Sequence, residues 1–319
     1  MLDWPGWPPS TLRMALVPLS RREFLAASAT AAAASLLPSA IFAAAPKGAP
    51  VASPAAWPVG CFNRPWTKWS YDETLDATRA AGFTLTGLLS AVPAKGDHFI
   101  GSAATPEYLA SLKQKLAARG LRANLGALRL KTNLPVAEAI ADTRQQLVNA
   151  QTLGLDFALT FGESNAQRYD TFYKVMSDAA AFGQERGIKL VMKPHGGSSG
   201  AADEILGAIQ RVGHPNFKIW YDAGNIIYYT GKDPVTELEP IAHHVTGFCA
   251  KDCGAVKGEV MIQFGTGKVN FAAVFKKLKS AGFNGPVMIE GCTVADTLQA
   301  TTENARANRV FLEKVLASV

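Results

Sequence analysis

The chain has 319 residues, of which 48% are hydrophobic and 18% are charged. This composition excludes a disordered chain, which would be less apolar, and a polytopic membrane protein, which would carry fewer charges. The formal net charge of +6 is spread over a long chain and does not require a nucleic-acid partner. Four cysteines without a CxxC pair exclude a disulfide scaffold.

The first 45 residues have the pattern of an export leader. Residues 20–25 read Ser-Arg-Arg-Glu-Phe-Leu, a weakly apolar Ala-rich run follows, and three alanines at 43–45 offer a cleavage site. This pattern is typical of a twin-arginine signal peptide, and the alternative is a buried Ala-rich helix. A Pro/Gly/Ala linker follows over 46–57, and no later run is apolar enough to anchor the chain in a membrane. We therefore expect the twin-arginine translocase to deliver a soluble protein to the periplasm.

From residue 57 onward, short apolar runs alternate with longer amphipathic stretches. The short runs predict strands over 58–62, 84–89, 121–126, 156–161, 188–193, 217–222, 246–250 and 286–290. The amphipathic stretches predict helices over 71–81, 106–119, 135–153, 169–187, 201–211, 233–243, 270–281 and 301–317. Eight such units predict an α/β fold, a single (β/α)8 TIM barrel over 58–319. A doubly wound open sheet is disfavoured, because the first strand is not followed by a glycine-rich phosphate turn.

Polar side chains gather where the predicted strands end, which is where barrels of this kind carry their chemistry. These residues are Asn63, Arg64, Glu163, Lys193, His195, Asp222, Asn225, Lys251, Asp252 and Glu290. Lys193 and His195 are two positions apart, so both side chains point the same way from an extended strand. A lysine inside a barrel is costly unless a carboxylate lies near it. Asp222 and Glu290 are its predicted partners.

Several of these residues have a purely structural alternative. His195 would then be held in a glycine turn, Asp222 would cap the next helix, and Lys251 would pair with Asp252 at the barrel rim. Glu163 would be a solvated loop carboxylate. The aromatic Trp66, near the end of the first strand, either stacks on a sugar face or packs the rim.

The region from about 57 to 317 resembles the sugar-phosphate isomerase/epimerase superfamily, the xylose isomerase-like barrels. The resemblance rests on segments in the same order and spacing, at 187–195, 221–225, 251–252, 265–270 and 287–290. It implies a sugar or keto-sugar isomerase, epimerase or related lyase that works by proton transfer next to a carbonyl. It also implies a divalent metal, held by Glu, Asp, His and Glu on strands five to eight.

Two of these four metal ligands are altered in this chain. Asp222 and Glu290 match the pattern, whereas Lys193 stands at the strand-five Glu position and Cys249 at the strand-seven His position. One interpretation is that His195, Asp222 and Glu290 bind Mn²⁺, Fe²⁺ or Zn²⁺. A second is that the Lys193 ammonium replaces the metal and stabilises an enediolate near Glu290. A third is a non-catalytic sugar-binding protein with a relict site.

The catalytic interpretations assign roles to individual residues. Proton transfer and charge stabilisation are predicted for Glu290, Lys193 and Glu163. Contacts with a small carbohydrate substrate are predicted for Asn63, Asn225, Lys251, Asp252 and Trp66. The AP-endonuclease branch of the same barrels would need a cluster of histidines for several metals, and of the five histidines in this chain only His195 follows a strand. We therefore expect no nucleic-acid partner.

Overall fold

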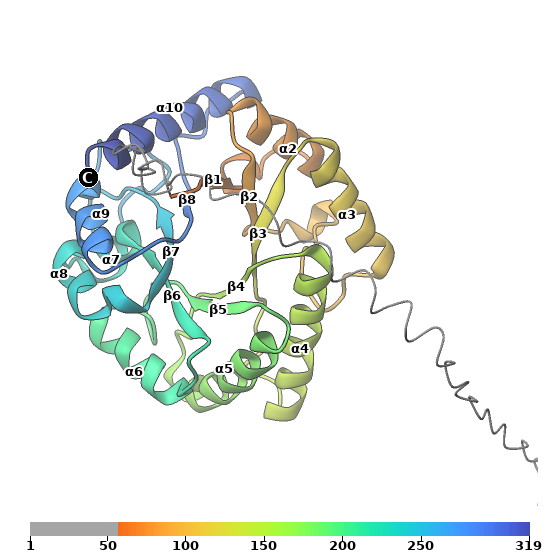
Figure 1. Ribbon diagram of the computed structural model, residues 1–319. Coiled ribbons are helices and arrows are strands. Elements are labelled where there is room, and N and C mark those ends of the chain that lie inside the picture. Colours follow the sequence, from red (N-terminus) through yellow and green to blue (C-terminus); the bar gives the residue numbers. More distant parts are fainter. Residues whose placement is uncertain (1–56) are drawn as a thin grey trace, which may run out of the picture. The chain divides into compact units, whose positions relative to one another are not determined.

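The computed structural model describes residues 57–319, which form a closed barrel of eight parallel strands (Figure 1). The strands are β1 (Val59–Phe62), β2 (Leu85–Leu88), β3 (Arg122–Ala127), β4 (Phe157–Thr160), β5 (Lys189–Met192), β6 (Phe217–Asp222), β7 (Val245–Ala250) and β8 (Val287–Ile289). Each strand pairs with the next one along the chain, and β8 pairs with β1, with Val59 opposite Val287. The predicted TIM barrel is confirmed.

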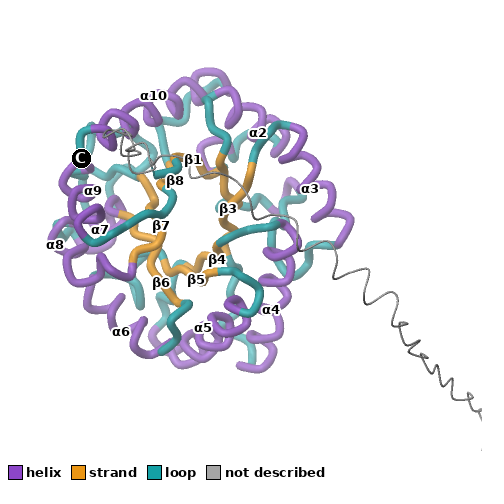
Figure 2. Tube along the Cα trace, in the orientation of Figure 1, coloured by secondary structure: helices purple, strands orange, loops and turns teal. Residues whose placement is uncertain are grey.

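Helices surround the strands on the outside of the barrel (Figures 1 and 2). They are α2 (Tyr71–Ala80), α3 (Pro106–Ala118), α4 (Val136–Leu153), α5 (Tyr169–Gln184), α6 (Ala202–Val212), α7 (Ala223–Thr230), α8 (Pro234–Leu238), α9 (Phe271–Ser280) and α10 (Leu298–Ala317). Helix α7 was not predicted. It begins directly after β6 because the Asp222 carboxylate accepts a hydrogen bond from the Asn225 backbone N–H at 2.9 Å and caps the helix.

One predicted helix is shorter than expected. The stretch 233–243 forms α8 and then a 3₁₀ helix, Glu239–His244, because Pro240 has no N–H to continue the α-helical hydrogen bonds.

The described region begins at Trp57, whose indole N–H donates to the Phe283 carbonyl at 2.9 Å. Barrel packing therefore includes residue 57, while the predicted export leader and the rest of the linker lie outside the described residues.

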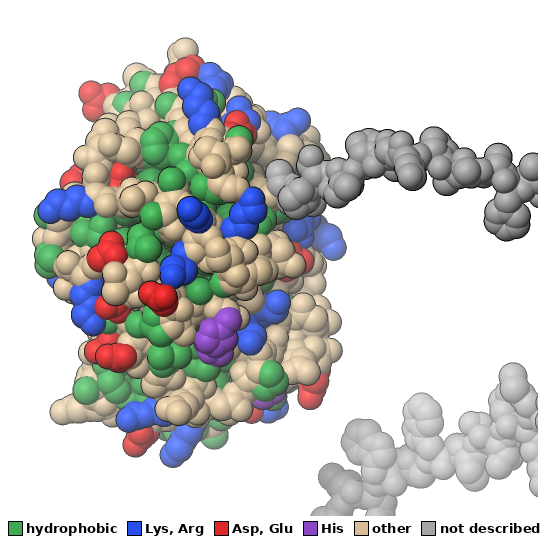
Figure 3. Space-filling model, turned by 60° about the vertical axis from the view of Figure 1, so that its left-hand side comes forward, with side chains coloured by type: hydrophobic (Ala, Val, Ile, Leu, Met, Phe, Trp, Pro, Cys, Tyr) green, Lys and Arg blue, Asp and Glu red, His purple; other side chains and the backbone are tan. Residues whose placement is uncertain are grey.

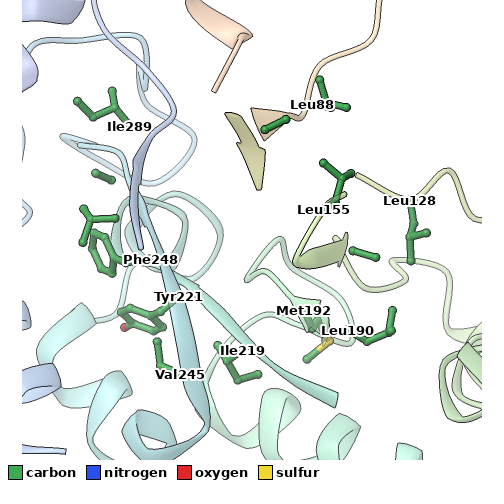
Figure 4. Packing of buried hydrophobic residues seen from close by; sticks show 14 of the residues in the cluster. Leu88, Leu128, Leu155, Leu190, Met192, Ile219, Tyr221, Val245, Phe248 and Ile289 are labelled. Carbon is green, nitrogen blue, oxygen red and sulfur yellow. The ribbon is translucent and has the colours of Figure 1, made fainter. Parts of the chain in front are cut away.

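Two apolar layers follow from the alternation of side chains along each strand. The larger layer lies between the strands and the helices and includes Leu190, Met192, Ile219, Tyr221 and Phe248 (Figure 4). The smaller layer fills the barrel interior with Phe62, Leu85, Leu89, Leu125, Ala127, Leu159, Val191, Trp220, Cys249 and Met288. This interior layer fixes which residues at the strand ends point inward.

The surface of the barrel carries charges of both signs. On the face in Figure 3, basic and acidic side chains are interspersed. Among residues 57–319, no helix is both long enough and apolar enough to cross a bilayer.

Candidate active site

The side-chain alternation of β5 to β8 places four ionisable residues at the C-terminal mouth of the barrel. Val191, Trp220, Cys249 and Met288 point into the barrel. Because side chains repeat every second residue, the next inward residue of each segment is Lys193, Asp222, Lys251 and Glu290, respectively. Four consecutive segments thus aim two ammonium groups and two carboxylates at the same point.

These four side chains form a closed cycle of alternating charge, which we call the charged ring (Lys193, Asp222, Lys251 and Glu290). Asp222 Oδ2 lies 3.0 Å from Lys193 Nζ and 3.1 Å from Lys251 Nζ. Lys251 Nζ lies 3.0 Å from Glu290 Oε1, and Lys193 completes the cycle by an ion pair with Glu290 Oε2. The contacts of Asp222 Oδ2 are charge contacts without the direction of a hydrogen bond. The predicted partners of Lys193 are therefore confirmed.

Two further residues contact Glu290 from outside the ring. Arg64, two residues after the inward-facing Phe62, forms an ion pair with Glu290 Oε1. The Cys249 thiol donates to Glu290 Oε2 at 2.8 Å. Arg64 was recognised as a strand-end residue but not assigned to the site. Its spacing from Phe62 does not predict this contact, because the backbone at Asn63 is already helical (φ −71°, ψ −6°). Cys249 belongs to the apolar interior layer and also donates to Glu290. The second role could not be predicted from a cysteine in an apolar strand.

The charged ring is shielded from water. The exposed fraction of its side chains is 0–3%, whereas that of Arg64 is 31%. Burial opposes ionisation of Glu290, but Lys193, Lys251 and Arg64 together hold the pKa of Glu290 well below its ordinary value. Burial likewise opposes the charge on Lys193, but the carboxylates of Glu290 and Asp222 raise its pKa nonetheless. Burial raises the pKa of Cys249 well above its ordinary value, so it stays a neutral thiol.

His195 lies at the mouth rather than in the ring. Its ring nitrogens are 2.9 Å and 3.1 Å from the Tyr229 hydroxyl, and its ring packs against Tyr229 and Phe161. Partial burial, and then the positive charges of Lys193 and Lys251, lower the pKa of His195 to about 4. The histidine is therefore neutral at pH 7.

Comparison with known proteins identifies the family. A family model described as "Xylose isomerase-like TIM barrel" matches residues 75–314. The chain belongs to this family. No curated protein sequence matches it.

Solved structures with the same fold include an L-ribulose 3-epimerase (18% identity, 82% of this chain and 94% of that chain covered, TM-score 0.63). D-psicose 3-epimerase from Clostridium cellulolyticum H10, solved with D-tagatose, is 14% identical, with 81% and 99% covered and a TM-score of 0.64. A xylose isomerase-like protein from Mycobacterium smegmatis, solved with magnesium, is 16% identical, with 83% and 98% covered and a TM-score of 0.67. The neighbours of this xylose isomerase-like chain thus include sugar epimerases.

In this member of the xylose isomerase-like family, the side-chain atoms that could bind a divalent metal already have other partners. Asp222, Cys249 and Glu290 place ligand atoms within 4.8 Å of one another, and His195 is not in this group. Both oxygens of Glu290 and Oδ2 of Asp222 already face cations, and Asp222 Oδ1 caps α7. The sulfur is a protonated thiol. With the two ammonium groups in place, this arrangement does not fit a divalent ion, and His195 does not complete it.

Two predicted substrate ligands have structural roles instead. Asn63 is buried and ties β1 to β2, since its Oδ1 accepts from the backbone N–H groups of Leu89 and Ser90, both at 3.0 Å. Asp252 is also buried, and its carboxylate accepts four backbone N–H groups, from Cys253, Gly265, Gly267 and Val269. It therefore shapes the loop between β7 and α9 and does not pair with Lys251, which belongs to the ring.

The hydrogen bonds of three more predicted site residues also differ from the predicted roles. Glu163 accepts from the Thr132 hydroxyl at 2.5 Å and from the Asn165 backbone N–H at 2.8 Å, so it holds a loop and does not touch the ring. Trp66 is fully buried and donates to the Thr302 hydroxyl of α10 at 3.3 Å, so it is not a sugar-stacking surface. Asn225 is buried and donates to the Pro194 carbonyl at 2.6 Å, which fixes the backbone beside Lys193.

Proposed function

We propose that this protein catalyses proton transfer next to the carbonyl of a sugar or keto-sugar, as an isomerase, epimerase or related lyase. In this proposal Lys193 and Lys251 do the work that the family resemblance assigns to a divalent metal. The observation that carries it is the position of two ammonium groups, at the ends of β5 and β7, each in contact with both carboxylates. The sugar epimerases among the structural neighbours support the reaction class.

The ammonium groups would stabilise the negative oxygen of an enediolate. Removing a proton from the carbon beside a carbonyl places negative charge on the carbonyl oxygen, and fixed positive donors in a water-poor site stabilise that charge strongly. Lys193 and Lys251 are fixed by their carboxylate partners and shielded from water. They would therefore need little reorganisation during the reaction.

Glu290 is the proposed base. In the free protein its carboxylate contacts Lys193, Lys251 and Arg64, which makes it a weak base. A substrate oxygen that inserts beside the lysines takes over some of these contacts, and the pKa of Glu290 then rises toward the range useful for proton transfer. Part of the binding energy of the substrate is thus used to raise the pKa of Glu290, so Glu290 becomes a stronger base only when substrate is bound.

Covalent catalysis through a lysine imine is a different mechanism, and the site does not favour it. Imine formation requires a neutral amine. The pKa of Lys193 is raised by its surroundings, so the side chain stays an ammonium. Borohydride trapping should accordingly give no stable sugar adduct on this protein.

The proposal is tested by solvent deuterium incorporation into a panel of keto-sugars, followed by NMR. We expect exchange at the carbon beside the carbonyl, unchanged after exhaustive treatment with EDTA, and lost in Glu290→Gln. Arg144→Gln is a matched control, because Arg144 pairs with Asp178 on the outer helices and does not contact the ring. Absence of exchange with every keto-sugar would overturn the enzymatic proposal, and loss of exchange with EDTA would overturn the role of the lysines.

A sugar-binding protein without catalysis is the second candidate. It is favoured by one observation: every carboxylate oxygen of the ring already has a partner within the chain. This candidate expects an increase in melting temperature with a sugar ligand, no deuterium exchange, and the same ligand-induced increase in Glu290→Gln.

Export to the periplasm is proposed separately, on the Ser-Arg-Arg-Glu-Phe-Leu motif at 20–25 and the Ala-rich run after it. Replacing Arg21 and Arg22 together by Lys should leave the full-length protein in the cytoplasm of a host with a twin-arginine translocase. Cell fractionation measures this. Equal periplasmic recovery of the variant and the natural sequence would contradict it.

A further inference from the structure

The mouth of the barrel holds more positive than negative charge. Lys193, Lys251 and Arg64 face only two carboxylates, Asp222 and Glu290, which leaves one formal positive charge in excess. Cys249 and His195 do not alter this count, because both are neutral at pH 7. The four ring residues are shielded from water, and the third cation, Arg64, lies at their partly exposed side, so the site favours a ligand that brings a negative charge to Arg64.

The reaction itself does not remove this excess. When Glu290 accepts a proton from a sugar carbon, the carboxylate becomes neutral and the enediolate oxygen gains the negative charge. The total charge of the site is therefore the same before and after the transfer. With a neutral sugar the excess of one positive charge persists throughout, and with a singly charged substrate the site is balanced at every step.

Arg64 is placed to receive such a charge. It is the one cation of the cluster with substantial exposure, at 31%, and only its Nη1 is hydrogen-bonded within residues 57–319. The remaining N–H groups of the guanidinium match the two oxygens of a carboxylate. The other carboxylate near Arg64 is that of Glu259, which is exposed and accepts from the backbone N–H groups of Val260 and Met261. An exposed carboxylate of this kind compensates the charge of Arg64 only weakly.

We infer that the substrate is an acidic sugar, a keto-sugar with a carboxylate that binds Arg64. This inference rests on the proposed function for its reaction but not for its binding step. Binding and reaction are also connected. A substrate carboxylate that draws Arg64 away from Glu290 removes one of the cations that make Glu290 a weak base. A phosphate ester is the other anionic source, and its charge of about −1.5 to −2 exceeds the excess of one.

The test compares three ketoses that differ only at one end: D-fructose, D-fructuronate and D-fructose 6-phosphate. Binding to the protein is measured by calorimetry, and deuterium exchange is measured on the same samples. We expect the uronate to bind best, and we expect Arg64→Gln to weaken it by about 10- to 100-fold, the range for losing hydrogen bonds to a charged group. Arg64→Lys should recover part of the affinity because it keeps the charge, and Arg144→Gln should leave it unchanged.

Each outcome separates the inference from the proposed function. Uronate binding that depends on Arg64, without exchange, supports the acidic ligand and overturns the reaction. Exchange with D-fructose at equal or higher efficiency than with the uronate supports the reaction and overturns the acidic substrate. Preferential binding of the phosphate ester, or uronate binding that is unchanged in Arg64→Gln, also overturns the inference.

Discussion

Removing the charge of Glu290 should destabilise the protein far more than removing the charge of Lys193. In Glu290→Gln, three cations face Asp222 alone, and the excess positive charge of the buried cluster rises from one to three minus one, that is, two. Breaking a buried ion pair by deleting one partner costs about 3–5 kcal/mol. For a domain of this size, that corresponds to a decrease of roughly 6–20 °C in melting temperature.

Lys193→Met has the opposite effect on the charge count. It leaves Lys251 and Arg64 facing Asp222 and Glu290, so the cluster becomes formally neutral. Methionine also fills a volume similar to that of the lysine stem in the barrel interior. We therefore expect Lys193→Met to cost less than about 3 kcal/mol, because Lys251 and Arg64 still face both carboxylates and no uncompensated buried charge is left.

Urea unfolding followed by circular dichroism measures both variants, and its pH dependence gives a second check. The pKa of Glu290 is lowered in the folded state, so its contribution to stability is complete above the unfolded pKa of about 4.3 and is lost as the pH falls toward the folded pKa. The difference between the natural sequence and Glu290→Gln should therefore shrink below about pH 4. A Lys193→Met cost equal to that of Glu290→Gln, or a difference that is constant with pH, would refute the charge count.

Three further predictions concern single contacts. The pKa of His195, measured by NMR titration with His195→Gln to assign the signal, should be about 4, and a value near the ordinary 6.5 would contradict the combined influence of burial and the two lysines. Asp252→Ala leaves four backbone N–H groups without their acceptor and should lower the free energy of unfolding by about 2 kcal/mol or more, with faster proteolysis in the loop between β7 and α9, whereas unchanged cleavage would argue against its structural role. Lys193→Glu combined with Cys249→His restores the ligand types that the family resemblance implies, so calorimetry should detect Mn²⁺ binding in this variant and not in the natural sequence. Equal binding by both proteins would show that the lysines do not exclude the metal.

The sequence predicted the barrel and the core of the site because both depend on simple periodicities. Eight strand–helix units predicted the closed sheet, and a lysine among apolar strand residues required carboxylates, which Asp222 and Glu290 supply. Helix α7 was missed because the capping pattern at Asp222 was read as a structural alternative to a site residue. In the structure Asp222 has both roles, with one oxygen on the helix and the other facing the ring.

The incorrect site residues were chosen by type and position without regard to the direction of the side chain. Asp252 lies next to the inward-facing Lys251, so alternation turns it away from the ring. Asn63 follows the end of β1, where the backbone is already helical (φ −71°, ψ −6°), and its side chain turns to the backbone of Leu89 and Ser90. Glu163 is an even number of residues from the inward-facing Leu159, so alternation alone would point it inward. Gly162, with a φ of 78°, ends the extended conformation one residue earlier. Side-chain alternation therefore excludes only Asp252 from the sequence alone, whereas Asn63 and Glu163 depend on backbone angles that the residue pattern does not specify.

The two lysines of the ring carry the charge of a divalent metal without its coordination chemistry. Two ammonium groups carry the same charge as one divalent cation, and Lys193 and Lys251 place that charge between Asp222 and Glu290. An ammonium, however, has no open coordination position and can hold a substrate oxygen only through its three N–H groups, which in Lys193 and Lys251 already face the carboxylates. If the acidic substrate that we infer is correct, its selection depends less on chelation of neighbouring oxygens and more on charge balance, to which Arg64 contributes the excess cation.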